Sequence, residues 1–320
     1  MFWSAARRIT ICAALLVILL GIWCHASQGK QTLTRTMKTE FFTVHYDPSD
    51  PYLPQLMSET AKIALLRVSR ELGYTPDKTR PLTLNIYRTH ISFIEAGGLQ
   101  QSKFTVGTAS SGSEVISVDA SGVFAPANET IAHEVTHAVI FRILGANVSD
   151  LPLWVNEGIA QYESEEFPDA DNSVVAEAAA DVRLIPLDDL SKAFPENNTH
   201  LAYAESASAI RYMVKHHGKS SLKALLHEMA IGNSFDRAMI KSTRRSGERF
   251  AQDWESSVSR NYATLKFTRI AMGTIPIIMA ILAIIAYFVR RKQKIEAARQ
   301  WEQEEFEKTL RRQLGNDWWR

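Results

Sequence analysis

The sequence predicts an α+β domain flanked by two membrane segments, on the evidence of three observations. Segments with the alternating, β-branched and aromatic pattern of strands fall within the first 120 residues of the 320-residue chain. From Asn128 to about Tyr262 most segments have the apolar spacing of helices. Strands followed by helices are typical of α+β domains, here a small N-terminal β-sheet with a helix and then a mainly helical half. Strongly apolar runs near both ends supply the membrane segments.

The expected elements of the N-terminal part are strands and short helices in alternation. Aromatic, β-branched or alternating residues predict strands at Glu40–Tyr46 and Pro81–Arg88, and two strands around a Ser-Gly turn within Thr105–Ala120. Apolar residues at helical spacing predict a helix over Leu53–Leu72, and a shorter helix is expected over Ile91–Ala96. A sheet with one long helix is therefore expected to precede the helical half.

The first apolar run, Ile9–Trp23, has the composition of an export signal. It comes after Arg7 and Arg8, and the small residue Ala26 offers a cleavage point. The run is also long enough, at the short end, to serve as an uncleaved anchor. Residues 1–26 are therefore expected to be either a signal peptide or a signal anchor, and both interpretations place the domain after residue 26 outside the cytoplasm.

The second apolar run, Ile270–Val289, has the length of a transmembrane helix. Basic residues come directly after it, beginning with Arg290 and Arg291, which predicts that residues 290–320 form a cytoplasmic, charged helical tail. An extracytoplasmic domain is then expected over residues 27–268. Nothing in the tail identifies a partner, and its alternating charges are typical of a solvated helix face.

Composition excludes some classes of function. The chain has 36 Lys+Arg and 35 Asp+Glu, so it lacks the basic character of a nucleic-acid-binding protein. Its two cysteines, Cys12 and Cys24, lie in or beside the first apolar run. The exported domain therefore has neither a disulfide nor a cysteine ligand, and any metal site in it must consist of His, Asp and Glu.

The segment IAHEVTHAVI carries the first candidate site residues. A helix is expected between a cap at Asn128 and a stop at Gly145, and on it His133 and His137 lie one turn apart on the same face. Two imidazoles placed in this way can bind one Zn²⁺. Glu134 points about 100° around the helix, beside the metal rather than onto it, where it can take a proton from a metal-bound water.

A catalytic zinc site needs a third protein ligand and an open position for water. The segment LPLWVNEGIAQY places Glu157 in a largely apolar helix, where a carboxylate without a partner is unfavourable. By contrast, the acidic residues from Glu163 to Glu166 are expected to lie on a helix surface. Glu157 is therefore the candidate third ligand.

HEVTH followed after nineteen residues by the glutamate of WVNEGIAQY resembles the gluzincin metallopeptidases, which include thermolysin-like enzymes and zinc aminopeptidases. The chain most resembles the bacterial peptidase-MA-like group of membrane-attached proteins, over about residues 40–262. The resemblance implies a zincin-like helical half carrying the HExxH helix. It also implies Zn²⁺ ligands at His133, His137 and Glu157, and a general base at Glu134. Tyr203 matches the place of a family tyrosine that steadies the oxyanion, although a core aromatic at that position remains the alternative.

The sequence departs from the thermolysin-like pattern at Gln161, where those enzymes have an acid one turn beyond the glutamate ligand. The aminopeptidase motif for a free N-terminus is not recognisable in Gly107–Val118, which we expect to form the edge strand that pairs with an extended peptide. An endopeptidase is therefore favoured over an aminopeptidase.

The predicted function is a zinc-dependent metallopeptidase anchored in the cell (inner) membrane, with a periplasmic or other extracytoplasmic catalytic domain. It would hydrolyse peptide bonds in extracytoplasmic proteins or peptides, with Glu134 activating a zinc-bound water. The alternative is a catalytically silent, zinc-containing module that binds peptides or assists envelope assembly. The presence of Glu134 argues against that alternative, because a site that only binds metal does not need this carboxylate.

Overall fold

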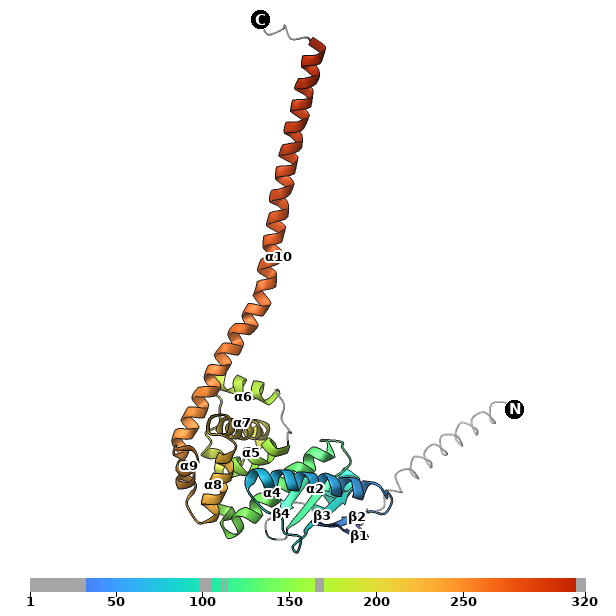
Figure 1. Ribbon diagram of the computed structural model, residues 1–320, viewed down its shortest axis with the longest axis vertical. Coiled ribbons are helices and arrows are strands. Elements are labelled where there is room, and N and C mark those ends of the chain that lie inside the picture. Colours follow the sequence, from blue (N-terminus) through green and yellow to red (C-terminus); the bar gives the residue numbers. More distant parts are fainter. Residues whose placement is uncertain (1–32, 98–104, 111, 113, 165–169, 315–320) are drawn as a thin grey trace, which may run out of the picture. The chain divides into compact units, whose positions relative to one another are not determined.

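A computed structural model of the chain describes residues 33–97, 105–110, 112, 114–164 and 170–314 (Figure 1). The predicted signal peptide or anchor, residues 1–26, lies outside the described residues. The chain divides into two units, residues 1–258 and residues 259–320. The first unit contains the sheet and the helices that cover it, and the second contains the greater part of the C-terminal helix.

A five-stranded mixed sheet forms the N-terminal part of the first unit, as expected. Its strands are β1 (Arg35–Lys38), β2 (Phe42–Tyr46), β3 (Leu82–Tyr87), β4 (Gly107–Ser110) and β5 (Val115–Asp119). They lie in the order β1-β2-β3-β5-β4. The three inner strands are parallel, and both edge strands are antiparallel to their neighbours. The sequence did not predict β1, because its residues are polar and largely exposed.

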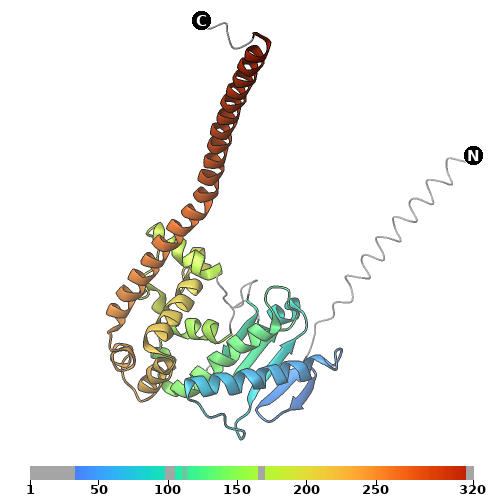
Figure 2. The same ribbon diagram turned by 45° about the horizontal axis from the view of Figure 1, so that its top comes forward.

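The register of the sheet places its buried side chains in rows. Val44 pairs with Leu84, and Leu84 pairs with Ile116, so three fully buried aliphatic side chains lie side by side across the inner strands. They belong to the core that α2 (Leu53–Leu72) and α4 (Ala127–Leu144) complete. These two helices pack against each other along their length (Figures 1 and 2). Burial of this apolar surface is the main force that holds the helices to the sheet.

The predicted helix over Leu53–Leu72 is confirmed. The helix that carries HEVTH begins slightly earlier than expected: Pro126 occupies its N-cap position and no side chain caps it, so the predicted cap at Asn128 is wrong. Proline is tolerated there because the first amides of a helix have no intrahelical acceptor. The short helix predicted over Ile91–Ala96 is present as α3 (His90–Gly97).

The helical half of the first unit continues from α4 through a 3₁₀ turn, Gly145–Asp150. Its helices are α5 (Leu153–Ser164), α6 (Ala170–Ala180), α7 (Thr199–His217), α8 (Ser220–Ala230) and α9 (Phe235–Thr243). α5 packs against both α4 and α7. The two predicted ligand-bearing elements, α4 and α5, therefore share one interface, which positions the site.

The C-terminal helix α10 (Gly247–Leu314) is continuous and includes Pro276. Within the described part of the chain it is the one helix long and apolar enough to cross a membrane, over Thr274–Gln313. The apolar residues from Ile275 to Val289 expose half or more of their surface. Exposed apolar surface of this extent on a helix is typical of a segment that lipid covers. The predicted boundaries at residues 268 and 290 both fall inside this one helix.

Candidate metal centre

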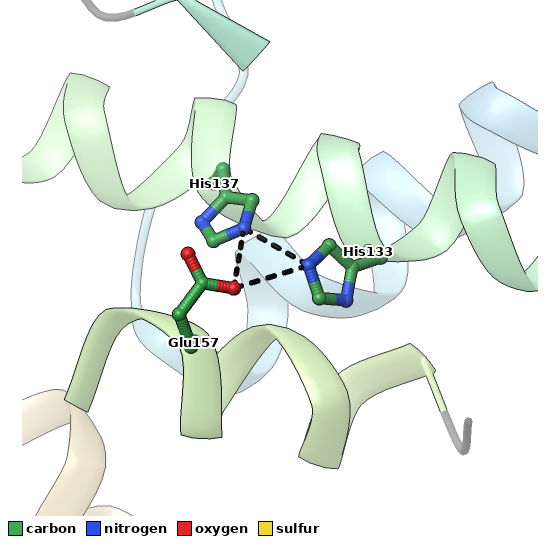
Figure 3. Close-up of side chains that lie close together, drawn as sticks. All are labelled: His133, His137 and Glu157. Atoms are coloured by element: carbon green, nitrogen blue, oxygen red, sulfur yellow. Dashed lines mark hydrogen bonds and ion pairs between the residues drawn. The ribbon is translucent and has the colours of Figure 1, made fainter. Parts of the chain in front are cut away.

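Helices α4 and α5 bring His133, His137 and Glu157 together (Figure 3). The Nε2 atoms of the two histidines lie 3.1 Å apart. Oε2 of Glu157 lies 3.5 Å from the Nε2 atom of each histidine. One donor atom from each residue therefore forms a nearly equilateral triangle, and all three side chains are largely buried.

The size of this triangle fits a tetrahedral metal ion. Nitrogen and oxygen ligands lie about 2.0–2.2 Å from Zn²⁺, so the edges of a tetrahedron of such ligands measure about 3.4 Å. The observed separations of 3.1 and 3.5 Å bracket that value. The residues present can therefore hold a tetrahedral ion as three ligands and leave a fourth position open.

The electrostatics of the cluster also favour a cation. Burial alone would raise the pKa of Glu157, but His137 and His133 beside it hold that pKa below its ordinary value. Burial would in turn lower the pKa of His137, and the Glu157 carboxylate outweighs burial and raises it. The raised pKa of His137 favours its charged form beside the carboxylate, and a divalent ion placed in the triangle would stabilise the carboxylate in the same way.

A hydrogen bond to Asn156 sets the orientation of the His137 ring. Nδ1 of His137 lies 3.1 Å from Oδ1 of Asn156, the residue that immediately precedes Glu157 on α5. An amide oxygen can only accept, so Nδ1 carries the proton and Nε2 keeps its lone pair for a metal. The ring of Phe141 stacks on the imidazole ring of His137, with the centroids of the two rings 6.0 Å apart. Sequence reasoning missed Asn156, and its position beside the ligand in WVNEG was the available signal.

Glu134 is buried on α4 and faces the edge strand β4. A Cβ atom on Gly107 would lie 2.5 Å from Oε1 of Glu134, so the strand backbone runs directly against this carboxylate. Only glycine at position 107 leaves room for the glutamate side chain. The structure therefore places the candidate base next to the candidate ligands His133 and His137 and against the outermost strand of the sheet.

Close packing of α5 on α7 fixes the position of Glu157. A Cβ atom on Gly158 would lie 2.5 Å from the backbone oxygen of Ser206 and 2.7 Å from Cγ1 of Ile210. Because the glycine lacks this atom, the backbones of the two helices approach each other immediately beside Glu157, the candidate third ligand. The apolar surroundings predicted for Glu157 are provided by this interface.

Two further predictions have different outcomes. Tyr203 lies on α7 with its ring edge-on to Phe194, at a centroid distance of 4.9 Å, and its role at an oxyanion stays a prediction. The prediction that Glu163 lies on a helix surface is wrong: its side chain is 1% exposed and pairs with Arg67 on α2 at 2.9 Å. Gln161 is also buried, and its Oε1 atom has no partner within the described residues.

Comparison with known proteins agrees with this geometry. A family model described as the peptidase MA superfamily matches residues 60–260, which include both ligand-bearing helices and well over half of the chain. The chain matches no curated protein. A family match of this extent, over a domain that gathers two histidines and a glutamate at tetrahedral spacing, establishes the relationship: the chain belongs to the peptidase MA superfamily.

Proposed function

We propose that the protein is a membrane-anchored, zinc-dependent metallopeptidase that cleaves extracytoplasmic proteins or peptides. Membership of the peptidase MA superfamily supports a metallopeptidase. The observation that carries the proposal is the triangle of donor atoms on His133, His137 and Glu157, with separations of 3.1 to 3.5 Å. The buried Glu134 beside this triangle supplies the carboxylate that hydrolysis requires.

Zinc is the metal that best suits these ligands. Two imidazole nitrogens and one carboxylate oxygen are typical of catalytic zinc, whereas Mg²⁺ and Ca²⁺ prefer oxygen ligands in larger numbers. A zinc ion bound here would act as a Lewis acid toward the scissile carbonyl and acidify a water molecule. His133, His137 and Glu157 would hold it, and Asn156 would keep the His137 ring in the binding orientation.

Glu134 is proposed as the general base. Because Glu134 lies about 100° around the helix from His133, its carboxylate points beside the metal position and is not a ligand. It would accept a proton from the attacking water and then pass that proton to the leaving amine. Tyr203 is proposed to donate a hydrogen bond to the oxygen that gains charge during attack. Single substitutions that leave the three metal ligands intact can test both assignments.

The edge strand β4 is proposed to bind the substrate backbone. It is the last strand in the sheet order, so one of its edges has no strand beside it among the described residues. An extended peptide added at that edge would run past Gly107 and thus past Glu134. Pairing with a strand holds the substrate backbone and needs no contact with either terminus of the substrate. For this reason we favour an endopeptidase.

The proposed location rests on the charge and hydropathy of the two ends of the chain. We propose that residues 27–268 lie outside the cytoplasm, that residues 270–289 span the cell (inner) membrane and that residues 290–320 form the cytoplasmic tail. The long apolar helix over Thr274–Gln313 supports this arrangement. A fluorescent protein that matures only in the cytoplasm is expected to fluoresce in bacteria when it is fused after Arg320. If that fusion is dark and a reporter that works only after export is active at the same position, the proposed orientation is wrong.

The test of the function separates metal binding from catalysis. We would purify the full chain in detergent, measure zinc by elemental analysis, and assay cleavage of casein and of a peptide library. We expect about one zinc per chain in the wild type, zinc without cleavage in Glu134→Gln, and loss of both in Glu157→Ala.

The matched control is Glu228→Gln, which alters the other His-Glu pair of the chain. Glu228 lies on α8 and pairs with Lys241 and Asn233, away from the donor triangle. This variant should keep both zinc and activity. Zinc binding by a wild type that cleaves nothing would instead favour the silent peptide-binding or assembly module, and a wild type without zinc would refute the metal site.

A further inference from the structure

A cavity of about 710 Å³ lies beside the C-terminal part of α4, the helix that carries His133 and His137, and the proposed mechanism does not use it. Its walls come from the β4–β5 hairpin, the last turns of α4 and the loop between α2 and β3. The residues that matter for its chemistry are Tyr74, Arg80, Ser110, Glu114, Phe141 and Arg142. It lies wholly within the first unit.

The cavity lies along the same side of α4 as Glu134. Ala138, Phe141 and Gly145 line it, and they come after Glu134 at intervals of four, seven and eleven residues, so all four lie on one stripe of the helix. Phe141 forms a shared wall, because its ring also stacks on His137. A ligand that extends from the scissile bond along α4 therefore reaches the cavity.

Two independent measures give the distance between the base and the cavity. Along α4, seven residues separate Glu134 from Phe141, a rise of about 10 Å. Along β4, three residues separate Gly107, which touches Glu134, from Ser110, which lines the cavity, and three strand residues also span about 10 Å. An extended substrate therefore places its third residue from the scissile bond at the cavity.

Arg142 is the most buried charged group in the wall, with 8% of its side chain exposed. Its Nη2 donates to the backbone oxygen of Arg80 at 2.6 Å and to Oε2 of Glu114 at 3.0 Å. A long contact of 3.4 Å joins Nη1 to the hydroxyl of Tyr74. Nε of Arg142 has no acceptor within the described residues, but this atom is itself buried. The nitrogen of Arg142 with capacity left for a ligand is therefore Nη1, whose one contact is long.

The carboxylate of Glu114, the acid that contacts both arginines, has its two oxygens in use. Both oxygens of Glu114 are paired, one with Arg142 and the other with Nη2 of Arg80 at 2.7 Å. Oδ1 of Asp77 turns back to the amide and hydroxyl of Thr79. Arg80 uses a single nitrogen and is largely exposed. The two arginines and two acids balance in formal charge, and the guanidinium groups of Arg80 and Arg142 retain N–H donors that Glu114 does not occupy.

We propose that this cavity is a subsite for a substrate carboxylate, bound by Arg80 and Arg142 about three residues from the scissile bond. The inference rests on the proposed peptidase function and adds a substrate class to it. Guanidinium groups with unused donors select a carboxylate over an amide of the same shape, because charge-assisted hydrogen bonds are the stronger. The carboxylate can be an Asp or Glu side chain or the C-terminus of the peptide.

The test selects peptides by binding and by cleavage separately. Immobilised full-chain Glu134→Gln, in detergent and loaded with zinc, is exposed to randomised decapeptides with free or amidated C-termini, and the retained peptides are sequenced by mass spectrometry. Wild-type protein cleaves the same libraries, which locates the scissile bond. We expect Asp and Glu to exceed Asn and Gln by about fivefold at the third residue on one side of the bond.

The two library forms distinguish the sources of the carboxylate. If an acidic side chain is bound, the enrichment is the same in free and amidated peptides. If the C-terminus is bound, amidation abolishes it and cleavage falls about three residues from the free end. Equal retention of acids and amides at every position, in both libraries, would overturn the proposal.

Arg80→Gln tests the assignment to this cavity with little risk to the fold. Its side chain is exposed, and Arg142 binds the backbone oxygen of residue 80, which the substitution leaves in place. The enrichment should fall to about twofold or less. Arg88→Gln removes an equally exposed arginine outside the cavity and should retain the full preference. An enrichment that both variants keep equally would refute the assignment.

Failure of the function and failure of the subsite give different results. If the wild type cleaves nothing but Glu134→Gln retains acidic peptides in an Arg80-dependent way, the subsite holds and the peptidase proposal fails. If casein is cleaved and no acid preference is found by binding or cleavage, the peptidase holds and the subsite fails.

Discussion

Gly107 and Glu134 lie in direct contact across the interface of β4 and α4. A Cβ atom on Gly107 would come within 2.5 Å of Oε1, 2.7 Å of Cγ and 2.8 Å of Cδ of the glutamate. At Gly107, therefore, no side chain of β4 lies between the strand backbone, which we expect to bind substrate, and the proposed base Glu134. A peptide paired with this strand would have its backbone beside the carboxylate that accepts the proton.

Gly107→Ala is therefore expected to impair catalysis without unfolding the protein. The added methyl group meets the side chain of Glu134 from Cγ to Oε1, so the glutamate must shift and lose its position while the backbone of the strand stays in place. A misplacement of about 1 Å costs about a hundredfold in rate, so kcat/KM should fall by that order while zinc content stays unchanged. Gly112→Ala in the same hairpin is the control, because its added Cβ has no atom within 4 Å. Full activity in Gly107→Ala would contradict the role of Glu134.

The hydrogen bond between Asn156 and His137 predicts the outcome of a second substitution. Asn156→Ala removes the acceptor for Nδ1 and frees the ring to turn, whereas Asn156→Asp keeps an acceptor at the same place. We expect zinc affinity to fall by about 10- to 100-fold in the alanine variant and to be largely retained in the aspartate variant. Competition with a chelating dye measures both. Equal affinity in all three proteins would mean that Asn156 does not orient the ligand.

Tyr203→Phe distinguishes an oxyanion donor from a core aromatic. The ring contact with Phe194 survives the change, so a structural role predicts wild-type stability and activity. A hydroxyl that stabilises developing charge predicts a fall in kcat of about a hundredfold or more, with KM nearly unchanged. We expect the second result. Steady-state kinetics with a single peptide substrate decides between them, and unaltered kcat would remove Tyr203 from the mechanism.

The predictable part of the site was the part encoded in local spacing. His133 and His137 face the same way because four residues make about one helical turn, and no tertiary information is needed to see it. Glu157 could be added because a carboxylate in an apolar helix requires a partner. The contact between Gly107 and Glu134 joins residues far apart in sequence and depends on how closely a strand approaches a helix, which no pattern within either segment reports.

Misjudged residues share a physical cause. Glu163 belongs to an acidic stretch at the end of a helix, which resembles a solvated surface, yet Arg67 from α2 reaches it and makes its burial tolerable. The strand β1 lacks an apolar face, because it lies at the edge of the sheet, and so it shows no alternation. For Glu163 a partner distant in sequence decides the environment, whereas β1 forms by backbone pairing with the neighbouring strand β2, which needs no apolar side chains. In both cases local composition indicates the wrong environment.

A further prediction concerns the pH dependence of stability and is based on Glu205. This residue of α7 is fully buried, and burial raises its pKa to about 8, although the amide of Ile185 donates to both carboxylate oxygens and opposes the shift. The nearby Glu255 adds to the increase. In the unfolded chain the pKa of the same group is near its ordinary value of 4.5. Between these values the native protein retains a proton that the unfolded chain releases.

The contribution of Glu205 to the free energy of unfolding should therefore fall as pH rises from about 4.5 to about 8, since at this group the unfolded state binds fewer protons over that range. One such group contributes at most about 1.4 kcal/mol per pH unit. Glu205→Gln cannot ionise and still offers an oxygen to the amide of Ile185. Its stability relative to the wild type should therefore increase with pH up to about 8 and then become constant. Any cost of burying the amide nitrogen shifts this difference equally at every pH.

Denaturant unfolding of the full chain in detergent, followed by tryptophan fluorescence at intervals between pH 5 and pH 9, measures this difference. Trp254 is fully buried in the core of the first unit and reports its unfolding. Glu59→Gln, at an exposed position on α2, is the control for replacing a surface carboxylate by an amide. A Glu205→Gln variant whose stability parallels that of the wild type across the whole range would show that Glu205 is already ionised in the native state, stabilised by the Ile185 amide in spite of its burial.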